Sequence, residues 1–229
     1  MSSTEFQFNG ERMLADISGA LIWPEKNTVV VSDLHLAKGT SFASKGIFLP
    51  PYDSIETLSV LHSVLTRYAP DRVICLGDSF HDNEASTRLG PEEKDIIRQF
   101  TRLYDWIWIT GNHDPTPTPT LGGKITTQTS IANLMFRHIT MGGGSKGEIS
   151  GHFHPKAKIK IKGKKMSARC FISDGTDRLI MPAFGTYTGG LDISHPTIKA
   201  LFSDNYMVLI LGQRKVFTFP KTVLKNYER

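Results

Sequence analysis

The chain has 229 residues, 39% hydrophobic and 21% charged, which excludes wholesale disorder and allows a core of ordinary size. Its 27 Lys and Arg residues exceed its 22 Asp and Glu residues, but six of the lysines fall within residues 156–165, so the basic character is local. No apolar run of membrane-spanning length, no secretory signal and only two cysteines are present, which favours a cytoplasmic protein with no membrane partner and no disulfide framework.

The first elements along the chain are predicted to be strands. Residues 5–22 alternate between apolar and polar side chains around Asn9-Gly10, which indicates a β-hairpin. Residues 28–31 are a β-branched run without alternation, typical of a strand that is buried on both faces.

Two amphipathic helices are predicted between buried strands. Residues 53–68 carry leucines at helical spacing, with Asp53 or Ser54 as the expected N-cap. Residues 91–104 begin with Pro91 and have acidic residues in the first turn, which suits the positive end of a helix. The connections between the strands therefore resemble βαβ crossovers, which build a parallel sheet.

Three predicted buried strands end directly in polar, metal-capable residues. Ligands of open α/β sheets bind outside the carboxyl ends of the strands, so we expect these polar groups to meet in space. We expect Trp106 and Trp108 to pack in the core and not to stack on bases. The strands and the polar groups that follow them are 28–31 with Asp33 and His35, 72–76 with Asp78, and 106–109 with Asn112, His113 and Asp114.

The second half of the chain has mostly strand character. Residues 115–120 (PTPTPT) are predicted to be a loop, and Asp174-Gly175 a turn. No linker divides the sequence, so we expect one domain over residues 1–229. The predicted strands are 125–131, 134–136, 158–161 and 207–211.

The candidate ligands combine carboxylate, imidazole and amide groups. Such a mixed oxygen and nitrogen set suits Mn²⁺, Fe or Zn²⁺, and one bridging Asp can hold two ions about 3.5–4 Å apart. In Asp-x-His and His-x-His, alternate side chains point the same way along an extended chain. The candidates are Asp33, His35, Asp78, Asn112, His113, His138, His152 and His154.

The ordered motifs D-x-H, GD, GNHD, H and GH-x-H across residues 33–154 resemble the calcineurin-like metallophosphoesterase superfamily. Many members have GDxxD or GDxxH where this chain has GDSFHDN, so Asp78 is taken as the ligand and the roles of His81 and Asp82 stay open. Three segments further resemble the bacterial ligase-associated DNA damage response endonucleases (the PdeM group). These segments are FRH at 136–138, GEISGHFHPK at 147–156 and MPAFGTYTGGLDIS at 181–194.

The resemblance implies an α/β fold, namely a four-layer α/β/β/α sandwich of two mixed β-sheets flanked by helices. It implies two divalent ions, with manganese expected and iron or zinc as alternatives, and a bridging hydroxide that attacks phosphorus. His113 would protonate the leaving oxygen, and Asp114 would orient His113. The implied ligands are Asp33, His35, Asp78 and His154 for the first ion, and Asp78, Asn112, His138 and His152 for the second.

Residues near the end of the GH-x-H motif are candidates for substrate binding. Lys156, Lys158, Lys160 and Lys162 recur at every second position, so they share one face of a strand. This face could protect an exposed sheet edge or could bind the phosphates of an extended nucleic acid, and the sequence favours neither. His81 could likewise reach a substrate phosphate or be a surface histidine.

Three functions fit these features. The first is a phosphodiesterase acting on DNA, with single-stranded DNA as a candidate substrate, in repair with ligase or helicase partners. The second is a phosphatase or cyclic-nucleotide phosphodiesterase acting on small-molecule or protein phosphoesters, because one fold serves many substrates. The third is a nucleic-acid scaffold with a vestigial site, which the complete ligand set disfavours. An exposed strand edge would allow a homodimer.

Overall fold

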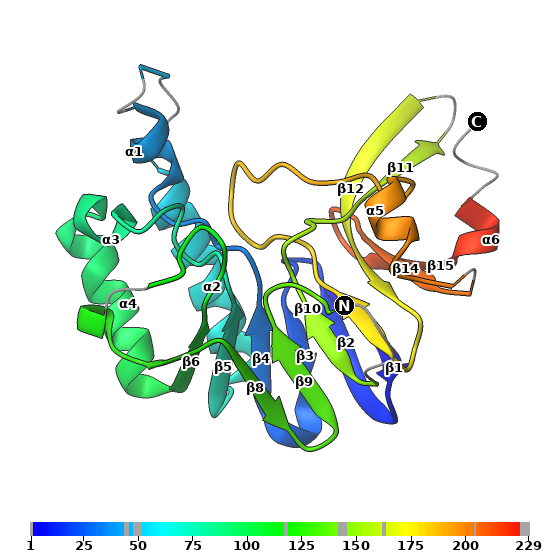
Figure 1. The fold of residues 1–229 in the computed structure, drawn as a ribbon, viewed down its shortest axis with the longest axis horizontal. Coiled ribbons are helices and arrows are strands. Elements are labelled where there is room, and N and C mark those ends of the chain that lie inside the picture. The colour runs from blue at the N-terminus through cyan, green and yellow to red at the C-terminus, as the bar shows by residue number, and fades with distance from the viewer. Residues whose placement is uncertain are drawn as a thin grey trace.

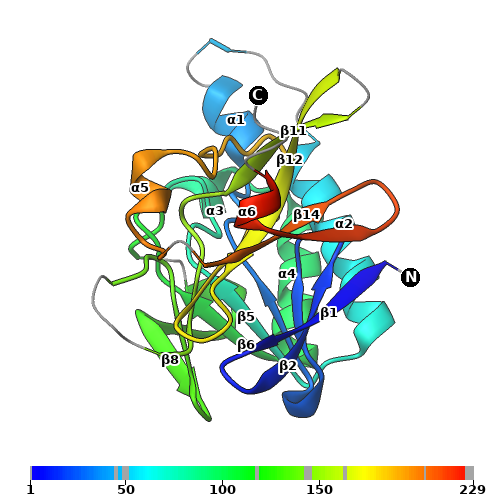
Figure 2. The same ribbon diagram turned by 90° about the vertical axis from the view of Figure 1, so that its right-hand side faces the viewer.

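Two β-sheets pack face to face in the computed structural model. Helices α2 (Asp53–Tyr68) and α4 (Pro91–Leu103) lie on the outer face of the first sheet (Figure 1). The short helices α5 (Pro196–Lys199) and α6 (Lys221–Leu224) lie on the side of the second sheet (Figure 2). The expected four-layer arrangement of two mixed sheets is therefore confirmed, although its fourth layer is thin. The structure describes residues 2–43, 46–47, 52–116, 119–141, 146–161, 164–203 and 205–224.

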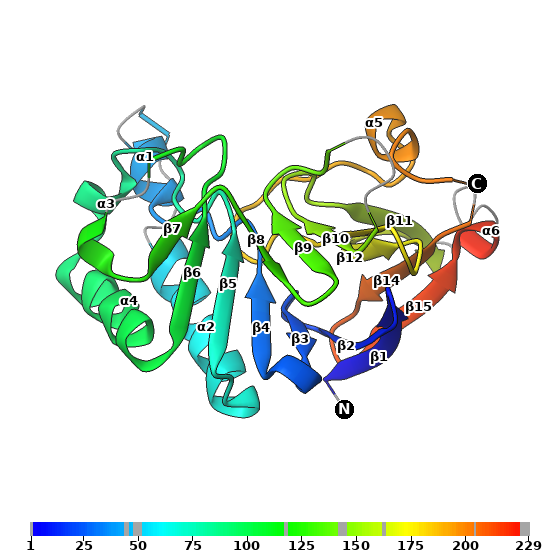
Figure 3. The ribbon, with the colours of Figure 1, turned by 60° about the horizontal axis from the view of Figure 1, so that its bottom comes forward.

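The first sheet is mixed and has the order β1-β2-β3-β4-β5-β6-β7. Strands β1 to β4 pair antiparallel, and β4 to β7 pair parallel. The parallel strands β4, β5 and β6 consequently end at the same edge of this sheet (Figure 3). The strands are β1 (Ser3–Phe8), β2 (Glu11–Asp16), β3 (Leu21–Trp23), β4 (Thr28–Val31), β5 (Arg72–Leu76), β6 (Asp105–Ile109) and β7 (Lys124–Thr126).

The second sheet has the order β15-β14-β12-β13-β10-β9-β8, and β11 pairs with β12. It is also mixed, because β10 runs parallel to both β9 and β13 while the other pairs are antiparallel. Its strands are β8 (Gln128–Ile131), β9 (Leu134–Arg137), β10 (Glu148–Ser150), β11 (Lys156–Ile161), β12 (Lys164–Ser173), β13 (Arg178–Ile180), β14 (Met207–Leu211) and β15 (Val216–Pro220).

Helices connect the parallel strands of the first sheet and are short elsewhere. The long ones are α2 and α4, whose apolar faces cover β4, β5 and β6. The helices are α1 (Lys38–Ala43), α2 (Asp53–Tyr68), α3 (Ala85–Arg88), α4 (Pro91–Leu103), α5 (Pro196–Lys199) and α6 (Lys221–Leu224), with 3₁₀ turns at Pro24–Lys26 and Pro119–Leu121.

Alternating side chains of the strands form three apolar layers. In β4, Val29 and Val31 face the helices, whereas Val30 faces the second sheet. Phe136 of β9 lies in the layer between the two sheets. A third layer packs around Ile198 of α5 on the outer face of the second sheet. Because β4 is buried on both faces, its sequence is a continuous run without polar alternation.

Most of the predicted elements are confirmed, and two predictions are wrong. Tyr52 occupies the N-cap position of α2 without a side-chain cap. Asp53 and Ser54 instead accept hydrogen bonds from the backbone N–H groups of Gly39 (3.0 Å) and Ala37 (2.7 Å). The predicted strand 125–131 is two strands in different sheets, because the chain turns sharply at Thr127.

Other predictions have mixed outcomes. Trp106 and Trp108 are buried beside the helices, as expected. The strands β3, β10, β12, β13 and β15 were not predicted from the sequence. In the predicted PTPTPT loop, residues 117–118 lie outside the described residues, and a 3₁₀ turn starts at Pro119. Among the described residues, no helix combines the length and apolar character that crossing a bilayer requires.

Removing a large side chain between the sheets should destabilise the fold. Phe136 is 0% exposed and lies next to Trp23, with ring centroids 6.3 Å apart. We expect Phe136→Ala to lower the free energy of unfolding by about 3–5 kcal/mol, since it leaves a cavity. Urea denaturation measures this loss, and Leu103→Ala, at a position 66% exposed, is the control with a change within about 0.5 kcal/mol. A loss below about 1 kcal/mol for Phe136→Ala would contradict this packing.

Candidate metal centre

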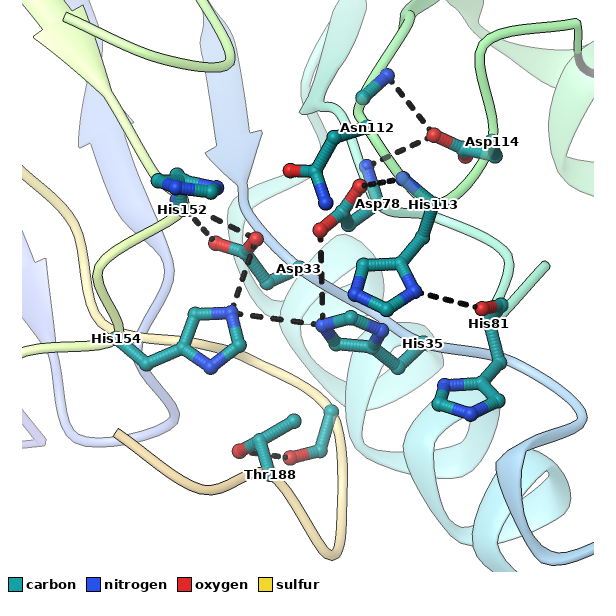
Figure 4. A network of polar contacts seen from close by, with 12 residues as sticks. Asp33, His35, Asp78, His81, Asn112, His113, Asp114, His152, His154 and Thr188 are labelled. Atoms are coloured by element: carbon teal, nitrogen blue, oxygen red, sulfur yellow. Dashed lines mark hydrogen bonds and ion pairs between the residues drawn. The ribbon is translucent and has the colours of Figure 1, made fainter. Parts of the chain in front are cut away.

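Side chains from five separate segments meet at the carboxyl ends of the parallel strands. Figure 4 shows those that follow β4, β5, β6 and β10. Three of these segments follow strands of the first sheet, and two come from the second sheet. All seven predicted ligands and His113 therefore lie in one place. The segments are Asp33 and His35 after β4, Asp78 after β5, Asn112 and His113 after β6, His138 after β9, and His152 and His154 after β10.

The first group of donor atoms comprises Asp33, His35 and His154. Their ligand atoms all lie within 4.8 Å of one another. Nε2 of His154 is 3.1 Å from Oδ1 of Asp33 and 3.4 Å from Nε2 of His35. The lone pairs of two imidazole nitrogens this close repel each other unless a proton or a cation lies between them.

The second group comprises Asp78, Asn112, His138 and His152. Nε2 of His138 lies 3.3 Å from Oδ2 of Asp78, 3.0 Å from Oδ1 of Asn112 and 3.3 Å from Nδ1 of His152. Nδ1 of His138 is 2.8 Å from the carbonyl oxygen of Leu76, to which it donates. This hydrogen bond fixes the ring so that Nε2 faces Asp78, Asn112 and His152, as in histidines that bind metals.

The Oδ2 atom of Asp78 belongs to the second group and also faces His35 of the first. It lies 3.3 Å from Nε2 of His138 and 4.0 Å from Nε2 of His35. The other carboxylate oxygen, Oδ1, accepts a hydrogen bond from the backbone N–H of His113 at 2.8 Å. The carboxylate is thereby fixed with one oxygen facing both clusters.

The ionisation of these groups suits metal binding. Burial raises the pKa of Asp78, but its hydrogen bond with His138 outweighs burial and lowers the pKa to about 2. Burial lowers the pKa of His35 to about 3, so its imidazole is neutral at pH 7. Burial also lowers the pKa of His138, yet the hydrogen bond to Asp78 and the charges of Asp33 and Asp78 raise it to about 8. In the absence of a cation, His138 therefore carries the positive charge that balances the carboxylates.

The backbone at this site is strained. A positive φ in a residue with a side chain costs about 1–2 kcal/mol, and such strain collects at functional sites. Five of the predicted ligands have this conformation, and no sequence pattern predicted it. Their φ angles are 54° for Asp33, 46° for His35, 45° for Asp78, 69° for His152 and 46° for His154.

Two glycines allow the segments to approach so closely. A Cβ atom on Gly111 would collide with the backbone nitrogen and Oδ1 of Asp78. A Cβ atom on Gly151 would collide with Oγ of Ser32 and with Oδ2 of Asp33. Glycine is therefore required just before Asn112 and just before His152.

The predicted catalytic pair is arranged differently from the expectation. His113 is exposed, and its Nδ1 lies 3.0 Å from the carbonyl oxygen of His81, which orients the ring. The Asp114 carboxylate, which was expected to orient His113, does not contact the His113 ring through a hydrogen bond. It accepts hydrogen bonds from the backbone N–H groups of Asp78 (3.0 Å), Phe80 (3.1 Å) and Gly111 (2.8 Å). Asp114 thus ties the loop after β5 to the loop after β6, and burial raises its pKa to about 6.

Of the predicted substrate-binding residues, His81 is the one in direct contact with the site. The rings of His81 and His113 stack, with centroids 5.4 Å apart. Lys156 and Lys158 share one face of β11. Nζ of Lys156 donates to the carbonyl oxygen of Thr188 at 3.2 Å, and Nζ of Lys158 lies 3.6 Å from Oδ2 of Asp192. Lys162, the last of the predicted series, lies outside the described residues.

The donor set fits divalent cations. Neighbouring ligands that each lie about 2.1 Å from one ion are about 3.0–3.4 Å apart in octahedral or tetrahedral geometry. The separations of 3.0–3.4 Å within each group match this range. The donors are carboxylate, amide and imidazole groups, a set that suits Mn²⁺, Fe or Zn²⁺. It contains no thiolate and so differs from the cysteine-lined sites of structural zinc ions.

Comparisons with known proteins show the family of the chain and a similar fold. Residues 26–212 match the family model described as calcineurin-like phosphoesterase. The fold is similar to that of the nuclease MPE from Pseudomonas putida, with a TM-score of 0.74 and 23% identity over 95% of this chain and 100% of that chain. The phosphoesterase Yfce from E. coli matches with a TM-score of 0.43 and 12% identity over 84% of this chain and 97% of that chain. No curated protein sequence matches the chain.

Adding a methyl group at Gly111 should weaken metal binding. The new Cβ would displace Asp78, so we expect Gly111→Ala to reduce Mn²⁺ affinity about ten-fold or more. Isothermal titration calorimetry with Mn²⁺ measures the affinity. Gly189→Ala is the matched control, because a Cβ there meets no atom within 4 Å. Equal Mn²⁺ affinities of the two variants would show that the close approach at Gly111 is not needed.

Proposed function

Since the chain belongs to the calcineurin-like phosphoesterase family and is a metal-dependent phosphoester hydrolase, we propose that it cleaves phosphodiester bonds of DNA. The observation that carries the proposal is the position of Asp78 Oδ2, which faces both groups of donor atoms. Two cations that share a carboxylate suit the in-line displacement by which phosphodiesters are hydrolysed.

The ligand assignments form part of this proposal. One ion would be held by Asp33, His35, Asp78 and His154, and the other by Asp78, Asn112, His138 and His152, with manganese as the expected metal. When bound, such a pair of ions lowers the pKa of a water molecule and neutralises charge on the phosphate.

His113 is proposed as the general acid. Its Nδ1–H donates to the carbonyl oxygen of His81, which leaves Nε2 for the substrate, and in the imidazolium form Nε2–H would protonate the leaving oxygen. Its exposed side chain can reach a substrate without unfolding any part of the site. Asp114 supports this chemistry indirectly, because it fixes the backbone on which Asp78 and His113 are placed.

Three observations favour a nucleic acid as the substrate. Lys156 and Lys158 follow His154 on the edge strand β11, and their charged face begins two residues from the donor groups. The Pseudomonas putida protein of similar fold is named a nuclease. The FRH, GEISGHFHPK and MPAFGTYTGGLDIS segments extend the proposal to DNA repair with ligase or helicase partners.

A substrate panel tests the proposed function. With Mn²⁺, we expect turnover of bis-p-nitrophenyl phosphate and of single-stranded DNA, little turnover of p-nitrophenyl phosphate or a cyclic nucleotide, and none with chelator. Because lysine–phosphate contacts release counterions, the affinity for DNA should fall steeply with salt. A preference for the monoester would support a phosphatase, and no turnover with any divalent metal would support a scaffold.

Two substitutions separate the proposed acid from the proposed bridge. His113→Ala should lower kcat about 10²–10⁴-fold while both Mn²⁺ ions still bind, because general acid catalysis contributes about this much. Asp78→Ala should abolish binding of both ions, since its carboxylate is shared. Metal content after dialysis, measured by inductively coupled plasma mass spectrometry, distinguishes them. Equal metal loss in the two variants would remove the assignment of His113 as the acid.

A further inference from the structure

A surface depression of about 320 Å³ adjoins the second group of donor atoms. Asn112 and His138 form the wall that it shares with the proposed metal site, and Arg137 lines it from the end of β9. Strand β9 ends on the same side of the molecule as β4, β5 and β6 (Figure 3). A ligand in the depression would therefore lie directly beside the reacting groups.

The guanidinium of Arg137 is mostly buried, with its side chain 13% exposed. Its Nε lies 3.4 Å from Oε2 of Glu148, a carboxylate that is 1% exposed. The same carboxylate lies 3.9 Å from Nε of Arg178 through Oε1. Two guanidinium groups thus share one carboxylate, so a positive charge at this position is not neutralised.

The outer nitrogens of Arg137 are available for a ligand. Glu148 is the sole carboxylate within 4.0 Å of this guanidinium in the described part of the chain. No described residue forms a hydrogen bond with either Nη atom. Two free N–H groups in a fixed fork match the oxygens of a phosphate.

The rim of the depression adds apolar surface. Ile139 is 41% exposed and Met141 is 62% exposed, and both line the depression. Gln128 lies on the wall formed by the start of β8. One cation beside exposed apolar side chains is the chemistry that recognises a nucleotide unit, with its phosphate and its sugar or base.

We propose that this depression binds the nucleotide next to the scissile bond and that Arg137 binds its phosphate. The inference rests on the proposed function and deepens it, because it explains how a polynucleotide would be preferred to a small diester. Arg137 directly precedes the proposed ligand His138, and it lines the depression beside the donor groups. Its guanidinium would bind the second phosphate of a polynucleotide, which a small diester lacks.

The test compares two substrates in one set of variants. In Arg137→Gln, kcat/KM for a single-stranded DNA oligonucleotide should fall about ten-fold or more, mainly through KM. The same variant should change kcat/KM for bis-p-nitrophenyl phosphate, which has no second phosphate, within about two-fold. The salt dependence of DNA binding should weaken by about one phosphate contact. Arg98→Gln, at an exposed arginine of α4 paired with Asp95, is the matched control.

Two further measurements keep the result interpretable. Arg137→Gln removes one positive charge beside Glu148, so Arg137→Gln/Glu148→Gln restores the net charge of the wild-type protein and should show the same selective loss. Fluorescence anisotropy of a labelled oligonucleotide with Ca²⁺ measures binding without turnover, and Kd should rise about ten-fold in both variants. Unchanged DNA kinetics, or equal losses on both substrates, would overturn the role of Arg137. Wild-type protein that hydrolyses the small diester but not DNA would instead overturn the proposed function.

Discussion

The carboxylate of Asp78 is the group on which the geometry of the site depends. It must face two clusters of donors at once, so its position is fixed from several directions. The backbone N–H of His113 holds Oδ1, and Asp114 holds the backbone N–H of Asp78 itself. Gly111 leaves the space that the carboxylate occupies. A buried, ionised carboxylate held in this way is stable only beside compensating charge, which His138 supplies in the absence of a cation.

The site also requires both sheets. The first sheet supplies Asp33, His35, Asp78 and Asn112 from the ends of parallel strands, while the second supplies three imidazoles. The hydrogen bond between Nδ1 of His138 and the carbonyl oxygen of Leu76 joins the two sheets at the edge of the layer that contains Phe136. Packing between the sheets therefore sets the distances between donors, which couples the stability of the core to the metal site.

Much of this arrangement could be predicted from the sequence. Strands β4, β5 and β6 are short apolar runs that end in polar residues, and the rule for parallel sheets places such ends together. The helix cap at Asp53 was mistaken because its carboxylate binds Gly39, a contact that depends on tertiary structure. Tertiary structure also determines the break between β7 and β8 at Thr127 and the hydrogen bonds of Asp114 to three backbone N–H groups, so the sequence did not predict them. The sequence did not indicate a functional role for Arg137, because only the fold places it beside Glu148 and in the same depression as Asn112.

The most direct measurement is anomalous X-ray scattering at the manganese edge from crystals soaked in Mn²⁺. Two peaks about 3.5–4 Å apart, one on each side of the Asp78 carboxylate, are the predicted result. A single peak, or two peaks that do not share Asp78, would contradict the central claim that one carboxylate joins two metal sites.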